Sequence, residues 1–237
     1  MRKKIAILFL GDFFYDARTI NMAIALSSNH SVTVIASFKK QINSPLFNKI
    51  TFYKINIKKM GWLKYLEYHY KASSFLKNKN FDFVISGDLY SLSASSLNKK
   101  NNKIIYDCRE IYSALSAHIN KPIYRFICFL YENFFMKYVD DVVVTAQTDL
   151  LFLKKKYSNF SHLNWHLIYN YPFGSFEKKQ QKIRIKYSIP DNHYILLYHG
   201  VLHKGRGLSQ LIKLTSKLSN ITSIIIGDGV DKKKYIK

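Results

Sequence analysis

Residues Tyr198-His-Gly-Val-Leu-His-Lys-Gly-Arg-Gly-Leu-Ser-Gln-Leu-Ile212 join an apolar run to a helix-like pattern through a basic, glycine-rich turn. Glycines let a ligand approach the backbone closely, and the first turn of a helix offers unpaired N–H groups to an anion. Arg206 adds a cation whose fork geometry suits two phosphate oxygens. The stretch therefore predicts a phosphate site at a strand-to-helix turn of an α/β fold.

Alternation of strands and helices extends through the sequence before this turn. The apolar run 5–10 is typical of a strand buried on both faces, and a helical pattern separates it from a β-branched run, 31–37. Further strands are predicted at 51–57, 82–86, 103–106, 141–145 and 167–169, and helices at 63–77 and 122–138. This alternation predicts an open, mostly parallel, Rossmann-like sheet.

The alternation lapses in one basic, polar stretch, 173–192, which contains Gly174 and Pro190. We interpret it as a linker between a first domain, 1–172, and a second, 193–237. The second domain has room for a single β-α-β unit, and so small a unit does not bury enough surface to stand alone. A complete Rossmann-like domain followed by an incomplete one is the expected architecture.

The chain has 237 residues, 48% of them hydrophobic, and a formal net charge of +22. A disordered basic tail is excluded by the hydrophobic content. The charge indicates an anionic partner, which could be nucleic acid, anionic lipid or a phosphorylated substrate, although an AT-rich genome would also enrich Lys, Asn and Ile. Cys108 and Cys128 lack metal-ligand spacing and suit a reducing cytoplasm.

The apolar run 5–10 is too short for a signal peptide, and no apolar stretch reaches the roughly 18–20 residues that span a bilayer. Two helical segments, 62–77 and 122–138, mix aromatic and basic side chains. Such a mixture suits a membrane interface, and it equally suits a helix packed on a sheet with its lysines in solvent. His199 and His203 have no further ligand set, so no metal site is predicted.

Carboxylates are scarce, and five of the fifteen follow predicted strands: Asp12, Asp16, Asp88, Asp107 and Glu110. Ligands of doubly wound sheets bind beyond the carboxyl ends of the strands. Asp107-Cys-Arg-Glu110 would place two acids and a guanidinium there, where they could orient sugar hydroxyls or pair with a phosphate. A helix-capping ion pair is the structural alternative.

Six stretches, taken together and in order, resemble the family 4 glycosyltransferases, retaining enzymes of the two-Rossmann GT-B fold. They are Gly11 with Asp16-Ala-Arg18, Tyr106-Asp-Cys-Arg-Glu110, Asp141-Val-Val-Val-Thr-Ala146, Ile168-Tyr-Asn-Tyr-Pro172, 200–208 and Ile226-Gly-Asp-Gly229. In that family the first domain binds the acceptor, and the second binds a nucleotide sugar, usually without a metal. The resemblance covers essentially the whole chain.

The resemblance implies that Arg206 clamps the donor diphosphate, with a nucleotide sugar as substrate and no cofactor or metal. The full set of implied donor-binding residues is Gly11, Gly200, Lys204, Arg206, Gly207, Gly227, Asp228 and Gly229. The residues implied to face the acceptor, in catalytic roles, are Asp107, Arg109 and Glu110.

The chain departs from the family pattern at three points. Val201 stands where a second basic residue is frequent, and Arg109 stands where His is frequent. The Glu-x₇-Glu segment that holds the donor sugar does not occur after Gly229, nor does the closing helix. The resemblance thus implies a chain truncated within its C-terminal domain, equivalent to about the first three-fifths of such an enzyme.

The implied function is transfer of a sugar, with retention, from a nucleotide sugar to a lipid-linked or polysaccharide acceptor in cell-surface glycan biosynthesis. The expected location is cytoplasmic, at the inner face of the cell membrane, with an anionic membrane surface as a further partner and no nucleic acid. Three alternatives stay open: a sugar-nucleotide epimerase of the same architecture, a non-catalytic basic binding module, and an inactive truncated gene product.

Overall fold

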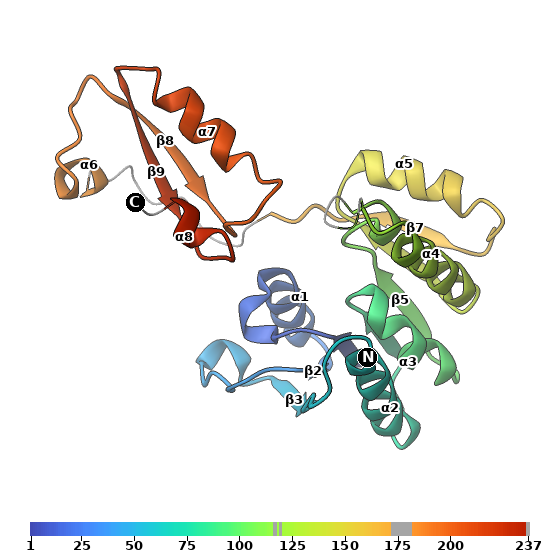
Figure 1. Cartoon of the computed structure of the whole chain (residues 1–237). Coiled ribbons are helices and arrows are strands. Elements are labelled where there is room, and N and C mark those ends of the chain that lie inside the picture. The colour runs from blue at the N-terminus through green and yellow to red at the C-terminus, as the bar shows by residue number, and fades with distance from the viewer. Residues whose placement is uncertain (116–117, 119, 172–181, 236–237) are drawn as a thin grey trace. The chain divides into compact units, whose positions relative to one another are not determined.

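A computed structural model describes residues 1–115, 118, 120–171 and 182–235, and the chain divides into two compact units, Met1–Phe173 and Gly174–Lys237 (Figure 1). The predicted linker 173–192 lies partly outside the described residues. Among the helices described, none combines the length and the apolar character needed to cross a membrane.

The first unit is built on a parallel sheet of seven strands in the order β3-β2-β1-β4-β5-β6-β7. Strand order reverses between β1 and β4, which makes the carboxyl ends of these two strands the expected place for a ligand. The predicted Rossmann-like sheet is confirmed. Its strands are β1 Lys4–Phe9, β2 Ser31–Ala36, β3 Ile50–Lys54, β4 Phe83–Ser86, β5 Lys103–Asp107, β6 Asp141–Val144 and β7 Asn164–Leu167.

Helices cover the two faces of this sheet unequally. Ile5 and Ile7 of β1 face the same core as Ala23 of α1, whereas Ala6 and Leu8 face the core built with α2 and α3. Helices α4 and α5 cover β5 and β6 on the same face as α2 and α3, and their side chains form one core with these strands. The helices are α1 Ala17–Ser27, α2 Leu63–Lys77, α3 Leu92–Leu97, α4 Pro122–Met136 and α5 Gln147–Lys156. Short 3₁₀ turns lie at η1 Phe13–Tyr15, η2 Pro45–Phe47, η3 Leu89–Ser91 and η4 Tyr112–Ala114.

The seventh strand differs from the prediction of 167–169. Strand β7 is Asn164–Leu167, so it begins three residues earlier and contains two exposed polar residues, Asn164 and His166. As the edge strand it pairs only with β6. Because its solvent face carries polar side chains, β7 does not form the continuous apolar run by which the buried strands were predicted.

The second unit contains one β-α-β element, as predicted. Strands β8 Tyr194–His199 and β9 Ile221–Ile226 are parallel neighbours, and α7 Leu208–Thr215 connects them. Short helices α6 Lys182–Lys186 and α8 Lys232–Tyr235 precede and follow this element. Leu196, Leu197 and Ile226 of the two strands remain exposed. The unit therefore leaves much of its apolar sheet uncovered.

Candidate functional site

Asp88 fastens the loop after β1 to the end of β4. Its carboxylate accepts hydrogen bonds from Leu10 N at 2.6 Å, Ser91 N at 2.8 Å and Ser91 Oγ at 2.7 Å. Burial raises the pKa of Asp88, although the hydrogen bonds from Ser91 and Leu10 act in the opposite direction. Three donors converging on one buried carboxylate fix the glycine loop that follows Leu10 at the topological switch point.

Gly11 lies in this loop, where a side chain would not fit without displacing the Phe9 ring. A Cβ at Gly11 would come within 2.5 Å of Phe9 Cε1. A cavity of about 420 Å³ opens beside Gly11 at the carboxyl ends of β1, β2 and β3, and Lys39, Lys54 and Lys64 are among its lining residues. Three lysines around one cavity favour an anionic ligand group.

Asp107, at the end of β5, is buried between two arginines. Arg18 Nε donates to Asp107 Oδ2 at 2.9 Å, and Arg18 Nη2 contacts Oδ1. From its other side, Arg109 Nε donates to Asp107 Oδ2 at 2.9 Å. The side chain of Asp107 is 1% exposed, so these two guanidinium groups replace its hydration.

Arg109 completes the cluster by reaching back to the start of α1. Its Nη1 donates to Asp16 Oδ1 at 2.7 Å and its Nη2 to Thr19 Oγ1 at 2.7 Å, while its guanidinium lies 4.9 Å from the centroid of the Phe9 ring. Burial would lower the pKa of Arg109, but Asp107 and Asp16 outweigh it, and the pKa is raised. We call Asp16, Arg18, Thr19, Asp107 and Arg109 the arginine cluster.

The N-terminal residue of this cluster also caps a helix. Asp16 accepts from Thr19 N at 2.7 Å as the N-cap of α1. Burial acts to raise the pKa of Asp16, but the hydrogen bonds from Thr19 and the charge of Arg109 prevail and lower it. Asp107 and Arg109 are therefore engaged within the protein, whereas Glu110, the third residue predicted to face the acceptor, is exposed.

An apolar cavity of about 410 Å³ adjoins the arginine cluster on the α1 face of the sheet. Ile85, Ile105 and Val143 supply its floor from β4, β5 and β6. The cavity is also lined by Arg18 and Asp107 of the arginine cluster, and by Asn170 and Tyr171 from the segment after β7. Cavities thus flank the switch point on both sides, one basic and one apolar.

In the second unit, the loops after β8 and β9 are joined by backbone hydrogen bonds. Gly200 N donates to Ile226 O at 3.0 Å, Leu202 N to Asp228 O at 2.9 Å, and Asp231 N to Leu202 O at 3.1 Å. A Cβ at Gly227 would lie 1.8 Å from Gly200 O, so only glycine lets the two loops meet. The structure thus brings Gly200 and residues 227–229 together; that they line a nucleotide cleft stays a prediction from the family resemblance.

The basic residues of the first loop precede α7 directly. Gly207 has φ of 74° and caps α7 without a side chain, so the N–H groups of the first turn have no side-chain partner from this cap. Arg206 is exposed, and its Nε donates to His203 Nε2 at 3.3 Å. Lys204 is exposed as well, and its carbonyl lies 2.6 Å from His203 Nδ1. Both cations are therefore accessible beside the helix start.

Asp228 lies on the second loop with its side chain 81% exposed. Its Oδ1 accepts from Gly229 N at 2.8 Å, and Lys232 Nζ lies 3.4 Å from its Oδ2. The hydrogen bond from Gly229 and the interactions with Lys232 lower its pKa. Asp228 thus stays ionised next to the paired loops, where it can accept hydrogen bonds from ligand hydroxyls.

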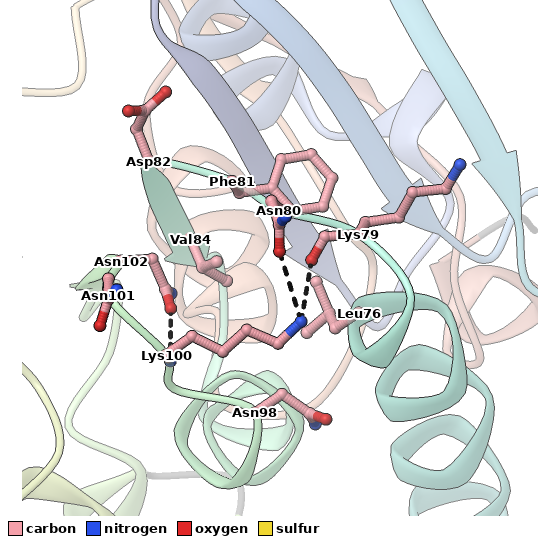
Figure 2. Close-up of a pocket in the computed structure, with 10 residues that line it drawn as sticks. All are labelled: Leu76, Lys79, Asn80, Phe81, Asp82, Val84, Asn98, Lys100, Asn101 and Asn102. Carbon is pink, nitrogen blue, oxygen red and sulfur yellow. Dashed lines mark hydrogen bonds between the residues drawn. The ribbon is translucent and has the colours of Figure 1, made fainter.

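A third hollow, of about 340 Å³, lies at the opposite, amino-terminal edge of the first unit's sheet (Figure 2). Lys100 spans it, and its Nζ donates to the carbonyls of Lys77 at 2.9 Å and Lys79 at 3.4 Å. Asn102 Oδ1 accepts from Lys100 N at 2.7 Å. These groups bind one another, and the carboxyl ends of the strands lie at the other edge, so we do not assign the site here.

Comparison with known proteins gives matches by structure alone, since the sequence matches no protein-family model and no curated protein. Sucrose-phosphate synthase from Thermosynechococcus elongatus is similar with a TM-score of 0.72 at 12% identity. HepE of Anabaena, in complex with UDP and glucose, gives 0.68 at 15%. WaaG, a glycosyltransferase involved in lipopolysaccharide biosynthesis, gives 0.67 at 15%.

The chain has the GT-B glycosyltransferase fold. The three matches cover 94%, 98% and 97% of this chain, but 62%, 63% and 65% of the other chains. This chain therefore spans less than two thirds of the length of those proteins. At sequence identities of 12–15%, structural similarity establishes the fold alone, and the reaction has to be inferred from the site.

From the sequence, no role was assigned to Arg18 or Thr19, although Arg18 belongs to the stretch Asp16-Ala-Arg18 that resembles the glycosyltransferases. Both residues bind groups that lie about ninety positions away in the sequence. One signal was available: Asp16 and Arg18 follow the first strand, and Asp107 and Arg109 follow a later parallel strand of the same sheet. Carboxyl ends of parallel strands share one edge, which brings such pairs together.

Proposed function

We propose that the chain forms the acceptor unit and part of the donor unit of a retaining glycosyltransferase. The enzyme would move a sugar from a nucleotide-sugar donor to a lipid-linked or polysaccharide acceptor during the synthesis of cell-surface glycans. The observation that carries this proposal is the pair of glycine loops at the carboxyl ends of β8 and β9, next to Arg206 and the start of α7. Support comes from HepE, a structure of similar fold in complex with UDP and glucose.

On the donor side, we assign charge neutralisation to Arg206 and Lys204. Negative charge grows on the diphosphate as it leaves the sugar, so a fixed guanidinium there stabilises the transition state more than the ground state. Amide groups at the start of α7 would bind the same phosphates. Gly200 and Gly207 would let the nucleotide approach the backbone, and Gly227 and Gly229 would keep the two loops together, because a Cβ there would meet Gly200 O or Leu202 O. Asp228 would accept a hydrogen bond from a ligand hydroxyl. The assignment uses protein groups and requires no metal.

On the acceptor side, we assign the carboxyl edge of the first unit. Glu110 exposes its carboxylate and would contact the acceptor directly, whereas Asp107 and Arg109 would hold that edge in place through the arginine cluster. Gly11, which the resemblance places among the donor-binding residues, keeps the loop after β1 clear of side chains, and the neighbouring lysines would meet an anionic group of a substrate. We propose the cytoplasmic face of the cell membrane as the place of reaction, where a lipid-linked acceptor would be within reach of this edge.

The experiment that tests this function supplies the chain with labelled nucleotide sugars, with and without lipid extract or glycan acceptor. Transfer of label to the acceptor, with retained anomeric configuration by NMR, is the expected result. A new nucleotide sugar formed without any acceptor would identify an epimerase instead. Absence of both products across UDP-, GDP- and ADP-sugars would contradict the proposal for this chain.

A further inference from the structure

Helix α4 presents apolar side chains on two opposite faces, of which the protein core uses one. Cys128, Glu132, Phe135 and Met136 are buried against the sheet. The other face carries Ile123, Phe126, Ile127, Leu130 and Phe134, and these five side chains, which we call the α4 stripe, are between 49% and 76% exposed. Packing against the sheet therefore explains the first face and leaves the α4 stripe unexplained.

The spacing of the α4 stripe makes it continuous along the helix. Its residues follow the i, i+3, i+4, i+7 pattern, with Phe126 and Ile127 adjacent, which places them on one side of a helix about 22 Å long. Ile127, Leu130 and Phe134 also line a shallow hollow of about 520 Å³ that is almost entirely apolar. A length of 22 Å is too short to cross a bilayer but suits a helix that lies in its surface.

Positive charge brackets the α4 stripe at both ends. Lys121 is exposed at the N-cap position, and Lys137 is exposed just after the last turn, with its Nζ 4.1 Å from the centroid of the Phe134 ring. Glu132 is the one acid in α4, and it is buried, where it accepts from Tyr106 and Lys156. The exposed side of α4 is thus apolar and basic with no exposed carboxylate.

The start of α2 extends the same surface. Trp62, Leu63 and Leu66 are exposed there, at 69%, 41% and 56%. A chain of tyrosines links the two helix starts: Tyr65 stacks on Tyr90 with 4.4 Å between centroids, and Tyr90 Oη lies 2.8 Å from Tyr124 Oη. Both helices precede strands of the parallel sheet, so both begin at its carboxyl edge, where the arginine cluster lies.

We infer that the α4 stripe, with the first turn of α2, docks the chain on an anionic lipid bilayer. Apolar side chains would enter the boundary between headgroups and acyl chains, while Lys121 and Lys137 would meet anionic headgroups. The proposed function supplies a reason for such docking, since a lipid-linked acceptor would be delivered to the carboxyl edge. Docking itself is a property of the surface and needs neither donor nor transfer.

Co-sedimentation with vesicles tests the inference in the full chain. Vesicles of phosphatidylcholine with phosphatidylglycerol should bind the protein, and vesicles of phosphatidylcholine alone should bind it far less. Phe126→Gln/Leu130→Gln should weaken binding about 10- to 100-fold, because two half-buried anchors are lost. A matched control is Leu151→Gln/Phe152→Gln, which removes two equally exposed apolar side chains from α5 and should bind like the original protein.

Failure of the original protein to bind anionic vesicles, or equal loss in the α4 and α5 variants, would overturn the inference. Self-association that disappears in the α4 variant, without vesicle binding, would overturn it in favour of a contact between two copies. Ile123→Gln, at the most exposed position of the stripe, repeats the test with a single change, and thermal melting verifies that each variant is folded. Because vesicle binding requires no substrate, its outcome is independent of the sugar-transfer assay.

Tryptophan fluorescence reports which part of the surface enters the lipid. The chain has two tryptophans, Trp62 on the proposed surface and Trp165 on β7. With brominated lipid in the vesicles, fluorescence of the Trp165→Phe variant, which retains Trp62, should be quenched on binding. Fluorescence of Trp62→Phe, which retains Trp165, should change little. The reverse pattern would place the membrane contact on another face and contradict the inference.

Discussion

Replacement of Asp107 by alanine is expected to destabilise the first unit by about 3–5 kcal/mol. Asp107 is buried between Arg18 and Arg109, so its removal leaves two guanidinium groups close together without their shared counter-ion. Folded domains are stable by only about 5–15 kcal/mol, so this loss is a large fraction of the total. Asp107→Asn keeps the shape and one acceptor and should fall between the original protein and the alanine variant.

Urea unfolding followed by tryptophan fluorescence measures this effect, because Trp62 and Trp165 both lie in the first unit. The matched control is Asp107→Ala/Arg18→Met, which removes one of the two uncompensated charges and should recover part of the stability. Asp82→Ala, which removes a solvent-exposed pair with Lys3 and a hydrogen bond from Lys4 N, should destabilise the unit far less than Asp107→Ala does. An Asp107→Ala variant as stable as this surface control would contradict the role of the arginine cluster.

Replacement of Arg206 by alanine is expected to weaken binding of a nucleoside diphosphate about 10- to 100-fold. A guanidinium can donate two charge-assisted hydrogen bonds to phosphate oxygens, and bonds to charged groups are worth about 1.5–3 kcal/mol. Turnover should fall further, by about 10²–10³, because charge grows on the leaving diphosphate in the transition state. Arg206→Lys should retain part of the affinity, since a lysine keeps the charge but loses the fork geometry.

Calorimetric titration with UDP, GDP and ADP measures the binding part of this prediction. Lys213→Ala is the matched control, because it removes one positive charge from the last turn of α7 without touching the glycine loops. Equal affinities of Arg206→Ala and Lys213→Ala would show that net charge alone attracts the nucleotide. That outcome would remove Arg206 from the proposed donor site.

Hydrophobic pattern alone was enough to predict the parallel sheet and the single β-α-β element that follows it. Strands β1 and β8 are both nearly continuous apolar runs between turns, the composition of buried parallel strands, and β1 is buried whereas β8 remains largely exposed. The edge strand β7 was placed three residues late because its exposed side carries Asn164 and His166. Local pattern is least informative where a strand has a neighbour on one side only.

The location of the candidate site could be predicted from the sequence, but the ion pairs between its acids and arginines could not. A parallel sheet directs residues after its strands to one edge, so Asp16, Asp88 and Asp107 were expected there. Which acid binds which arginine depends on the tilt of α1 over the sheet, and sequence spacing carries no such information. The two faces of α4 posed a similar problem, since hydrophobic periodicity does not distinguish a buried stripe from an exposed one.

We propose that the loops after β8 and β9 form a site for a nucleoside diphosphate. The most direct measurement is titration of the ¹⁵N-labelled chain with UDP, GDP and ADP, followed through the amide resonances of its glycines. Gly200, Gly205, Gly207, Gly227 and Gly229 should shift together with one saturable affinity, while Gly61, on a turn of the first unit, should not move. Loop resonances that stay fixed at saturating nucleotide, or shifts spread evenly over all glycines, would contradict the account.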